Sequence, residues 1–496
     1  MNKFEDNLIR FMDAGFPIIY IDTFEESKAV KYVQSAACGR VIMEWSVTGF
    51  CDYATNSVCP DWSLADTLRF LISDANSCHR RVLVLTDIHS YLSDPVVTAL
   101  LKLLAQKIVK GLDDFNIVMV SPVVVIPPEL EKFMSILSMD YLSQPEIKQV
   151  VNDFCDEQEI DRLSPQFLDE LSMALKGLTE FEICNMLAMA LTDDGEITSS
   201  DMDLIIEQKQ QLIRKSGILE MIPVKEDLSS IGGLENLKNW LQRKGKIFKN
   251  VAKAEKFGVD IPKGVLIAGM PGCGKSLNAK AAAKLFNVPL LRMDMGRLMG
   301  KYVGESEANM RKAIKLAEAI SPCVLWIDEL EKAFAGVGGN SGASDVTTRL
   351  FGTFLTWLQE KESLAFVVAT ANDIEKMPPE LMRKGRFDEI FYVGLPNKNE
   401  REKIFEIHIK KRRPNDFKKI DISALASKTD GYSGADIEGV VKESIEDTYA
   451  NEKTELTTQA INEAIKNTHS LKEIMKDKLE KMDTLYKERK YKNASV

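Results

Sequence analysis

The amino-acid sequence predicts two successive α/β domains, each built on a parallel sheet that is followed by a group of helices. Short apolar runs rich in Val and Ile alternate with amphipathic stretches over residues 17–125, as expected of parallel strands that are buried on both faces. The same alternation returns over residues 264–395. Residues 143–213 and 396–470 show helical spacing without strand character, so each sheet is followed by helices.

The expected strands are apolar runs rich in β-branched residues. In the first domain they are FPIIYID (16–22), RVLVLTD (81–87) and NIVMVSPVVVI (116–126). In the second domain they are GVLIAG (264–269), PLLRMD (289–294), CVLWID (323–328), LAFVVATA (364–371) and IFYVGL (390–395). Residues 94–112 predict a helix with Asp94 as its N-cap and Pro95 in its first turn. Residues 471–492 predict an amphipathic helix that packs on another part of the protein.

The tetrapeptide PPEL occurs twice, at residues 127–130 and 378–381. Asp87, at the end of an expected strand, precedes the first copy by 40 residues, and Asp328 precedes the second copy by 50 residues. A glycine-serine loop at residues 337–344 accounts for most of that difference. We therefore interpret the two halves as tandem copies of one architecture.

Composition and charge exclude several classes of function. No apolar run reaches the ~18–20 residues that a membrane span needs, and the N-terminus lacks the pattern of a signal peptide, so we expect a cytoplasmic protein. The eight cysteines show no zinc-type spacing and predict reduced thiols. Residues 1–220 contain 18 Lys and Arg against 35 Asp and Glu, and this negative charge opposes nucleic-acid binding.

The octapeptide GMPGCGKS, residues 269–276, follows one expected strand and precedes a helix, which is the context of a phosphate-binding loop. Gly272 and Gly274 let backbone N–H groups turn toward phosphate oxygens, where a Cβ atom would obstruct them. Lys275 can reach the β- and γ-phosphates of ATP, and the Ser276 hydroxyl can ligate Mg²⁺. The loop therefore predicts ATP and Mg²⁺ as cofactors.

The strand CVLWID delivers two acids, Asp328 and Glu329, at its carboxyl end, and Glu329 follows Lys275 of the phosphate loop by 54 residues. Asp328 would hold Mg²⁺, and Glu329 would polarise the attacking water. These residues together predict hydrolysis of the nucleotide.

Residues 226–470 resemble an AAA-type ATPase domain, and the motifs match along the whole segment. LSSIGGLENLK (228–238) resembles the family's entry segment, in which Ile231 and Gly232 would line the adenine pocket. The resemblance also implies that VVATAND carries a sensor asparagine, Asn372, and that His408 lies near the ribose and adenine. GYSGAD (431–436) resembles the lid segment, with Ala435 where many relatives carry a sensor arginine. The nucleotide-binding residues expected in this way are Ile231, Gly232, Pro271, Gly272, Cys273, Gly274, Lys275, Ser276, Leu277, Asp328, His408, Gly434 and Ala435.

The segment RKGRFD places Arg383 and Arg386 where the AAA family has arginine fingers. Both lie on a turn beyond the expected sheet, poorly placed for phosphates bound to their own chain, whereas guanidinium groups can be supplied in trans. The resemblance therefore implies a homo-oligomer, and AAA proteins typically form hexameric rings. GKYVGESE (300–307) resembles the central pore loop, in which Tyr302, flanked by Lys301 and Val303, would grip an extended chain. The alternative is a tyrosine that packs on a neighbouring helix.

More narrowly, the stretches SPCVLWIDELEKAF and RLFGTFLTWLQEKES resemble the conserved AAA proteins of algal chloroplasts and cyanobacteria and their bacterial relatives. Those proteins also carry a front half without a phosphate loop. In the present first half, TFEESKAVKYV follows the first strand and contains neither glycine nor a Lys-Ser pair. By order along the chain, Ile88 takes the place of Glu329, and counting from PPEL puts Lys132 at Arg383 and Ser135 at Arg386. We therefore expect a degenerate AAA-like domain that serves as scaffold, adaptor or substrate receptor.

The expected fold is thus a P-loop NTPase of the AAA+ class with a C-terminal helical lid, preceded by a degenerate AAA-like α/β domain with its own helical bundle. The expected boundaries are 1–213 for the degenerate domain (sheet 1–140, helices 141–213), 214–226 for a linker, 227–395 for the ATPase sheet, 396–470 for the lid and 471–496 for an amphipathic tail.

The expected function is an oligomeric, Mg²⁺-dependent ATPase that remodels or threads a protein partner. The alternative is a nucleotide-gated scaffold that changes its assembly state without threading. A nucleic-acid motor is disfavoured, because the front half is acidic and no nucleic-acid module is recognisable.

Overall fold

The computed structural model describes residues 3–23, 25–53, 57–73, 80–111, 114–215, 217–298, 305–333, 342–383 and 385–496. The chain forms two compact units, residues 1–140 and 141–496. No helix among the described residues is long and apolar enough to cross a membrane. The prediction of two α/β sheets is confirmed, one in each unit.

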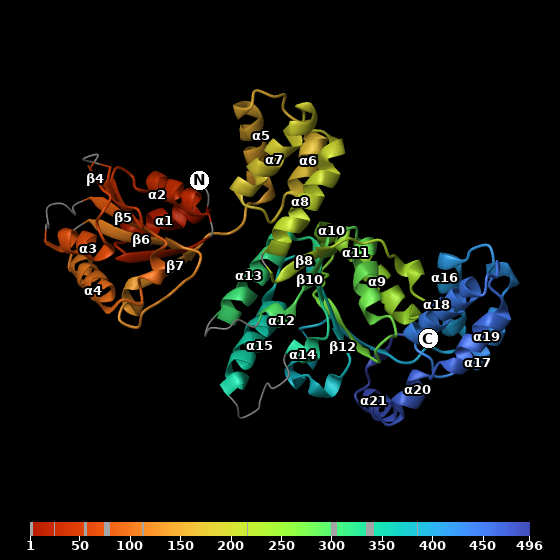
Figure 1. The fold of residues 1–496 in the computed structure, drawn as a ribbon. Helices are drawn as coiled ribbons and strands as arrows, with labels where there is room; N and C mark the ends of the chain where they lie inside the picture. Colours follow the sequence, from red (N-terminus) through yellow and green to blue (C-terminus); the bar gives the residue numbers. More distant parts are fainter. Residues whose placement is uncertain are drawn as a thin grey trace. The chain divides into compact units, whose positions relative to one another are not determined.

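The first unit contains a sheet whose five central strands are parallel, in the order β2-β5-β6-β1-β7, and whose β2 edge is extended by the antiparallel strands β3 and β4. Alternate side chains of these strands enter two separate cores, because successive residues of a strand point to opposite faces. Helices α1 and α2 cover one face, and α3 and α4 cover the other (Figure 1). The bounds are β1 Ile18–Asp22, β2 Val41–Ser46, β3 Gly49–Asp52, β4 Ser57–Cys59, β5 Arg81–Thr86, β6 Phe115–Ser121, β7 Met134–Ser138, α1 Lys3–Asp13, α2 Glu26–Ala36, α3 Leu64–Ser73 and α4 Pro95–Val109.

Two sequence predictions in this unit can be compared with the structure directly. Asp94 caps α4, since its carboxylate accepts a hydrogen bond from the Val96 N–H at 2.8 Å. The strand expected over residues 116–126 ends at Ser121. Pro122 follows it, and proline has no N–H group with which to continue the ladder.

The second unit contains the sheet β8-β10-β11-β12-β9-β13-β14, in which β8 alone is antiparallel to its neighbour. Helices α9 and α11 pack on one face, and α13, α15 and α21 pack on the other. The bounds are β8 Leu219–Ile222, α9 Glu235–Phe248, α10 Val251–Lys256, β9 Gly264–Gly269, α11 Lys275–Phe286, β10 Leu290–Met293, α12 Met295–Leu298, α13 Glu305–Ile320, β11 Cys323–Ile327, α14 Leu330–Ala333, α15 Gly342–Glu360, β12 Ala365–Ala371, β13 Glu389–Val393, α21 Lys476–Glu488 and β14 Lys492–Asn493.

Helices also occupy the segments that lie before and after this sheet. Helices α5 to α8 pack around an apolar core of their own, and α16 to α19 form a second helical group that we call the lid. Their bounds are α5 Gln144–Glu157, α6 Pro165–Ala174, α7 Glu180–Asp194, α8 Met202–Lys215, α16 Lys398–Arg412, α17 Ile422–Lys428, α18 Gly434–Ala450 and α19 Thr458–Asn467, and a short α20 Leu471–Ile474 follows. The expected linker at residues 214–226 contains β8, so this segment is part of the ATPase sheet.

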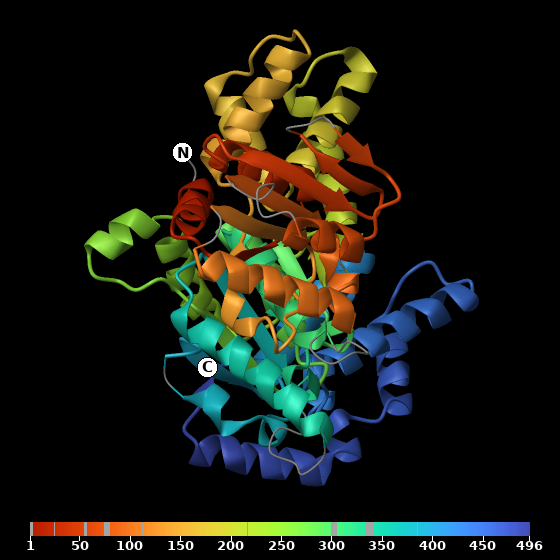
Figure 2. The same cartoon turned by 90° about the vertical axis from the view of Figure 1, so that its left-hand side faces the viewer.

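The amphipathic tail is also part of the ATPase sheet. Helix α21 places Leu479, Met482 and Tyr486 in the core under the sheet, and β14 pairs with β13. The dark-blue α21 lies beside the cyan segment that precedes β13 in both views (Figures 1 and 2). Tyr491 donates its hydroxyl hydrogen to the Met382 sulfur of that segment at 2.7 Å.

The five central strands follow the same order in both sheets, because β2-β5-β6-β1-β7 corresponds to β10-β11-β12-β9-β13. In each sheet, the strand that leads to the acids begins opposite the first residue of the neighbouring strand. Arg81 of β5 pairs with Phe115 of β6, and Cys323 of β11 pairs with Ala365 of β12. Six positions later each chain adopts a left-handed conformation, with φ of +51° at Asp87 and +52° at Glu329. Asp87 therefore corresponds to Glu329, and our alignment of Ile88 with Glu329 is wrong by one residue.

The same register corrects the comparison of the basic residues. Ser135 pairs with β1 at the position where Glu389 pairs with β9, so these two residues correspond. Lys132 then corresponds to Arg386, and each is followed by a buried phenylalanine. The first unit has three fewer residues between PPEL and this strand, and the position of Arg383 falls in that gap. Counting from PPEL failed because the loop lengths differ.

Candidate active site

A pocket of about 440 Å³ lies at the carboxyl ends of the central strands of the second sheet and is closed on one side by α16 and α18 of the lid. It contains every residue that we expected to bind the nucleotide, together with Glu329 and Asn372. These residues come from the segment before α9, the loop between β9 and α11, the ends of β11 and β12, and the lid. The sequence had placed them in separate motifs, and the fold brings them together.

The loop between β9 and α11 has the backbone geometry of a phosphate cradle. Gly272 and Gly274 have φ of +73° and +84°, a conformation that strains residues with a side chain. A Cβ atom on Gly272 would lie 2.9 Å from the side chains of Ala435 and Ser433, so the lid also requires glycine here. Helix α11 begins at Lys275, and the N–H groups of its first turn are available to an anion.

Lys275 is buried at the base of this loop. Its ammonium group donates hydrogen bonds to the carbonyl oxygens of Gly269 at 3.0 Å and Met270 at 2.6 Å. Burial lowers the pKa of Lys275, although the neighbouring acids Asp328 and Glu331 oppose that shift. The lysine is thus placed next to the acidic strand end, within the lining of the pocket.

The acids and the sensor asparagine form one connected cluster. The Ser276 hydroxyl donates to Asp328 Oδ1 at 3.3 Å, so the two expected Mg²⁺ ligands are neighbours. The Asn372 side-chain amide donates to Glu329 Oε1 at 3.1 Å. A buried threonine, Thr370, donates its hydroxyl hydrogen to Asp328 Oδ1 as well. Each of these contacts joins residues that are more than 40 positions apart in the chain.

Glu331 is a buried acid in this cluster that the sequence reasoning missed. Its Oε1 accepts a hydrogen bond from the Asn372 N–H at 3.0 Å, which fixes the backbone of the sensor residue. Burial raises the pKa of Glu331, and the charge of Glu329 raises it further. The available signal was the third acid in DELE, two residues after Glu329.

The side of the pocket formed by the lid contains His408, which is partly buried. Burial lowers the pKa of His408, so the ring is neutral at physiological pH, and the nearby Glu438 only partly opposes that shift. Burial alone would raise the pKa of Glu438, but hydrogen bonds from Lys442 and Arg412 lower it to about 2. A neutral imidazole next to a fixed carboxylate suits a polar, uncharged base or sugar.

Glu400 is a second residue that the sequence reasoning missed. It is buried in the pocket wall, and its Oε1 accepts a hydrogen bond from the Leu234 N–H at 3.0 Å. Its Oε2 accepts another from the Asn397 N–H at 2.9 Å, in the capping box of α16. One carboxylate therefore connects the segment before α9, which lines the pocket, to the first turn of the lid.

The remaining predicted residues do not line the pocket. Arg383 is exposed, and the Arg386 guanidinium donates to the Glu380 carbonyl oxygen within its own loop. Lys301, Tyr302 and Val303 lie outside the described residues.

The first unit differs at the equivalent place. In the segment after β1, burial raises the pKa of Glu26, and the charges of Asp87 and Glu44 raise it further. Glu26, at the start of α2 after β1, and Asp87 therefore place negative charge close to where the second unit has its phosphate loop, and this charge would repel a phosphate group. The Ser121 hydroxyl shares a hydrogen bond of 2.8 Å with His89 Nδ1 in the same region.

Comparison with known proteins matches four segments of the chain to known domain families. Residues 265–395 match the ATPase family associated with various cellular activities (AAA), and residues 419–463 match the AAA+ lid domain. Residues 4–139 and 145–216 match the N-terminal and second domains of SpoVK-like AAA ATPases. The AAA domain-containing protein ycf46 of Guillardia theta is 38% identical over 478 residues, which cover 95% of this chain and 92% of that protein. The chain belongs to the AAA ATPase family.

Two further relatives of this AAA ATPase differ in how much of it they cover. The ycf46 protein of Pyropia yezoensis is 35% identical over 498 residues, which cover 100% of both chains. The cell division cycle protein 48 homolog of Archaeoglobus fulgidus is 33% identical over 257 residues, which cover 50% of this chain and 34% of that protein. The resemblance to AAA proteins of algal chloroplasts is confirmed, and the protein is an ATP hydrolase.

The pocket of this AAA ATPase fits a nucleotide. The left-handed glycines and the start of α11 provide N–H groups for phosphates, and Lys275 provides a positive charge beside them. Ser276 and Asp328 could hold Mg²⁺, since a hydroxyl and a carboxylate oxygen are ligands that this ion accepts alongside phosphate oxygens.

Proposed function

We propose that this AAA ATPase is a Mg²⁺-dependent, oligomeric enzyme that uses ATP hydrolysis to remodel a protein partner. A backbone hydrogen bond between the lid and the phosphate loop supports this proposal most directly. The Ala435 N–H at the start of α18 donates to the Gly272 carbonyl oxygen at 2.9 Å. A change in the phosphates that this loop holds would therefore be transmitted to the lid, which is how hydrolysis can drive movement.

The residues of the pocket have distinct roles in this proposal. Lys275 binds the β- and γ-phosphates, and Ile231, Gly232 and His408 contact the nucleoside. Mg²⁺ bound through Ser276 would neutralise charge on the phosphate oxygens.

The acidic pair carries the chemistry. Asp328 supports the metal site, and Glu329 accepts a proton from the attacking water. Asn372 holds the Glu329 carboxylate in place through its bond of 3.1 Å.

We further propose a hexameric ring in the cytoplasm. The exposed Arg383 and the nearby Arg386 lie outside the pocket of their own chain, which supports a role at nucleotide that is bound by a neighbour. In this ring Tyr302 would contact the partner, and the first unit would serve as scaffold or receptor. We expect no nucleic-acid substrate, and stimulation of the ATPase by DNA or RNA would contradict this expectation.

Glu329→Gln tests the catalytic assignment. The amide keeps the shape and the contact with Asn372 but cannot accept the proton, so we expect nucleotide to bind and turnover to fall by about 100-fold or more. Phosphate release and binding of a fluorescent ATP analogue measure the two effects. Turnover that stays within about 2-fold of the unmodified enzyme would refute the role of Glu329, since a general base contributes about 10²–10⁴-fold.

The partner can be captured with the same variant. Glu329→Gln protein held in ATP should retain a protein partner that the unmodified enzyme releases, and this partner then allows the threading step to be tested. Tyr302→Ala should abolish partner remodelling while basal ATP hydrolysis persists. Remodelling that survives this change would favour the alternative, a nucleotide-gated scaffold.

A further inference from the structure

Thr370 lies between the two catalytic acids but belongs to the neighbouring strand, β12. Its side chain is 1% exposed. Its hydroxyl hydrogen is donated to Asp328 Oδ1, and its oxygen accepts a hydrogen bond from the Glu329 N–H at 3.2 Å. One hydroxyl group thus contacts both members of the acidic pair, the side chain of Asp328 and the backbone of Glu329.

The backbone of Glu329 adopts a strained conformation at this contact. Its φ of +52° lies in the left-handed region, a conformation that is strained for residues other than glycine and persists only where the surroundings hold it. This conformation turns the Glu329 side chain toward Asn372, whose amide it meets at 3.1 Å. The Thr370 hydroxyl gives the N–H of this residue an acceptor inside the buried sheet.

The first unit shows what the same fold does without this hydroxyl. Val120 corresponds to Thr370, and Thr86, which pairs with it, corresponds to Asp328. Asp87 still adopts φ of +51°, and its N–H donates to the Val120 carbonyl oxygen at 3.1 Å. The left-handed turn therefore forms with valine at this position, so the hydroxyl is not required for the fold. The Thr370 hydroxyl occurs in the second unit, which also has the acid Asp328.

We propose that Thr370 is a positioning residue for ATP hydrolysis, which orients the Asp328 carboxylate and holds Glu329 in its catalytic conformation. The inference rests on the proposed roles of the acidic pair. Threonine is suited to this task because a hydroxyl can donate and accept at once, whereas valine has the same shape and can do neither. Thr370 itself touches neither nucleotide nor water in this proposal.

Thr370→Val and Thr370→Ser separate this role from packing. We expect Thr370→Val to lower kcat about 10-fold or more, since about 1.4 kcal/mol of lost orientation is a factor of ten in rate. KM for ATP should change less than about 3-fold, because the phosphate loop is intact. Thr370→Ser should restore kcat to within about 3-fold of the unmodified enzyme, because it keeps the hydroxyl.

A second readout does not depend on turnover. The affinity for a fluorescent ADP analogue should rise less on addition of Mg²⁺ in Thr370→Val than in the unmodified enzyme, because Asp328 loses its fixed orientation. The affinity without Mg²⁺ should be the same in both. As a matched control, Thr448→Val removes another buried hydroxyl, which donates to the Ser444 carbonyl oxygen at 2.6 Å on α18, and should leave kcat unchanged.

The outcomes distinguish this inference from the proposed function. Thr370→Val should add little to the loss in a Glu329→Gln background, because both act on one step. If Glu329→Gln is inactive but Thr370→Val retains kcat within about 2-fold, the role of Thr370 is wrong and that of the acids stands. Equal losses in Thr370→Val and Thr370→Ser, with a lower melting temperature in both, would also overturn it. A fully active Glu329→Gln enzyme would instead refute the role of the acids.

Discussion

Lys209, on α8, is a buried cation that contributes nothing to the pocket. Its side chain is 3% exposed, and its ammonium donates to the Ala174 carbonyl oxygen at 2.6 Å. Burial lowers the pKa of Lys209 from its usual value of 10.5 to about 7. Between about pH 7 and 10.5 the unfolded chain therefore binds more protons at this site, so its contribution to stability improves as the pH rises.

Lys209→Met should stabilise the protein at neutral pH. Removing the buried charge is expected to raise the free energy of unfolding by about 1–4 kcal/mol at pH 7, and the gain should shrink as the pH approaches 10. Urea denaturation at pH 6, 8 and 10 measures this difference. Lys215→Met, an exposed lysine on the same helix, is the control and should change little. A gain that does not depend on pH would contradict the assignment to Lys209.

At the scale of single residues, the sequence identified some of the residues of the site and missed others. The glycines of the phosphate loop, Lys275 and Glu329 were predictable because their chemistry follows from a local pattern. Thr370 and Glu400 were not, because a threonine in a strand and a glutamate in a first helical turn are ordinary features. Their importance comes from partners 42 and 166 positions away.

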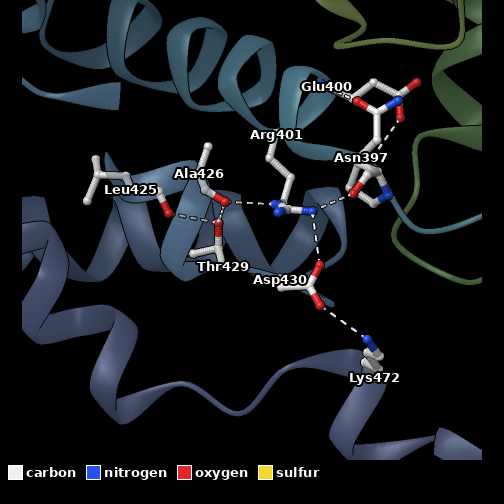
Figure 3. A network of polar contacts seen from close by, with 9 residues as sticks. Asn397, Glu400, Arg401, Leu425, Ala426, Thr429, Asp430 and Lys472 are labelled. Carbon is white, nitrogen blue, oxygen red and sulfur yellow. Dashed lines mark hydrogen bonds and ion pairs between the residues drawn. The ribbon is translucent and has the colours of Figure 1, made fainter. Parts of the chain in front are cut away.

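At the scale of elements, the side chain of Arg401 on α16 connects the lid to the loop that precedes it (Figure 3). Its guanidinium donates to the Ala426 carbonyl oxygen at 3.1 Å and to the Pro396 carbonyl oxygen at 2.8 Å. It also lies 3.5 Å from Asp430, which pairs with Lys472 at 3.1 Å. One buried cation thus connects the hinge before the lid, the middle of the lid and the segment that follows it.

Arg401→Met should weaken the lid. The buried carbonyl oxygens would lose their donors, and we expect the free energy of unfolding to fall by about 1–3 kcal/mol. Arg401→Lys should give a smaller loss, since lysine keeps the charge but lacks the planar fork. Denaturant titration measures both. The control is Lys403→Met, on the same helix as Arg401, which breaks an exposed ion pair with Glu235 of α9 and should cost less than about 1 kcal/mol. A cost equal to that of Arg401→Met would contradict the role of Arg401.

The C-terminal tail is the second element whose role depends on its contacts. Ala494 is fully buried, and its N–H donates to the Tyr392 carbonyl oxygen at 2.8 Å. Its own carbonyl oxygen accepts from the N–H groups of Asn236 at 3.0 Å and Leu237 at 3.2 Å. These two groups belong to the first turn of α9, where N–H groups have no partner within the helix. The tail therefore completes both the sheet edge and the start of α9.

Ala494→Glu should detach this tail. A carboxylate does not fit a fully buried alanine site, so we expect the free energy of unfolding to fall by about 2–3 kcal/mol. Limited proteolysis should then cut after α21 in the variant before it cuts the unmodified protein. Val496→Glu introduces the same charge at a residue that is 86% exposed and should have no effect. Equal behaviour of the two variants would contradict the role of Ala494.

At the scale of the whole molecule, the separation of Arg383 from its own pocket predicts that subunits complement one another. Arg383→Ala and Lys275→Ala proteins should each be inactive alone. Mixing them should restore part of the activity, because an intact pocket can then meet an intact arginine from its neighbour. ATP hydrolysis measured over a range of mixing ratios tests this. No recovery at any ratio, with assembly verified by light scattering, would argue against action in trans.

The sequence by itself determined the class of this protein and the residues of its phosphate loop and acidic pair. It could do so because buried parallel strands and a glycine-rich phosphate loop are short, contiguous patterns that reflect local burial and backbone requirements. The apparent match between Asp87 and Asp328 shows where this stops, since the register of paired strands places Asp87 at Glu329 instead. Only the tertiary structure decided that register, the place of β8 and β14 in the sheet, and the contacts of Thr370, Glu400 and Arg401. Such contacts join residues far apart in the chain, and the path of the chain between them is a property of the whole packed fold.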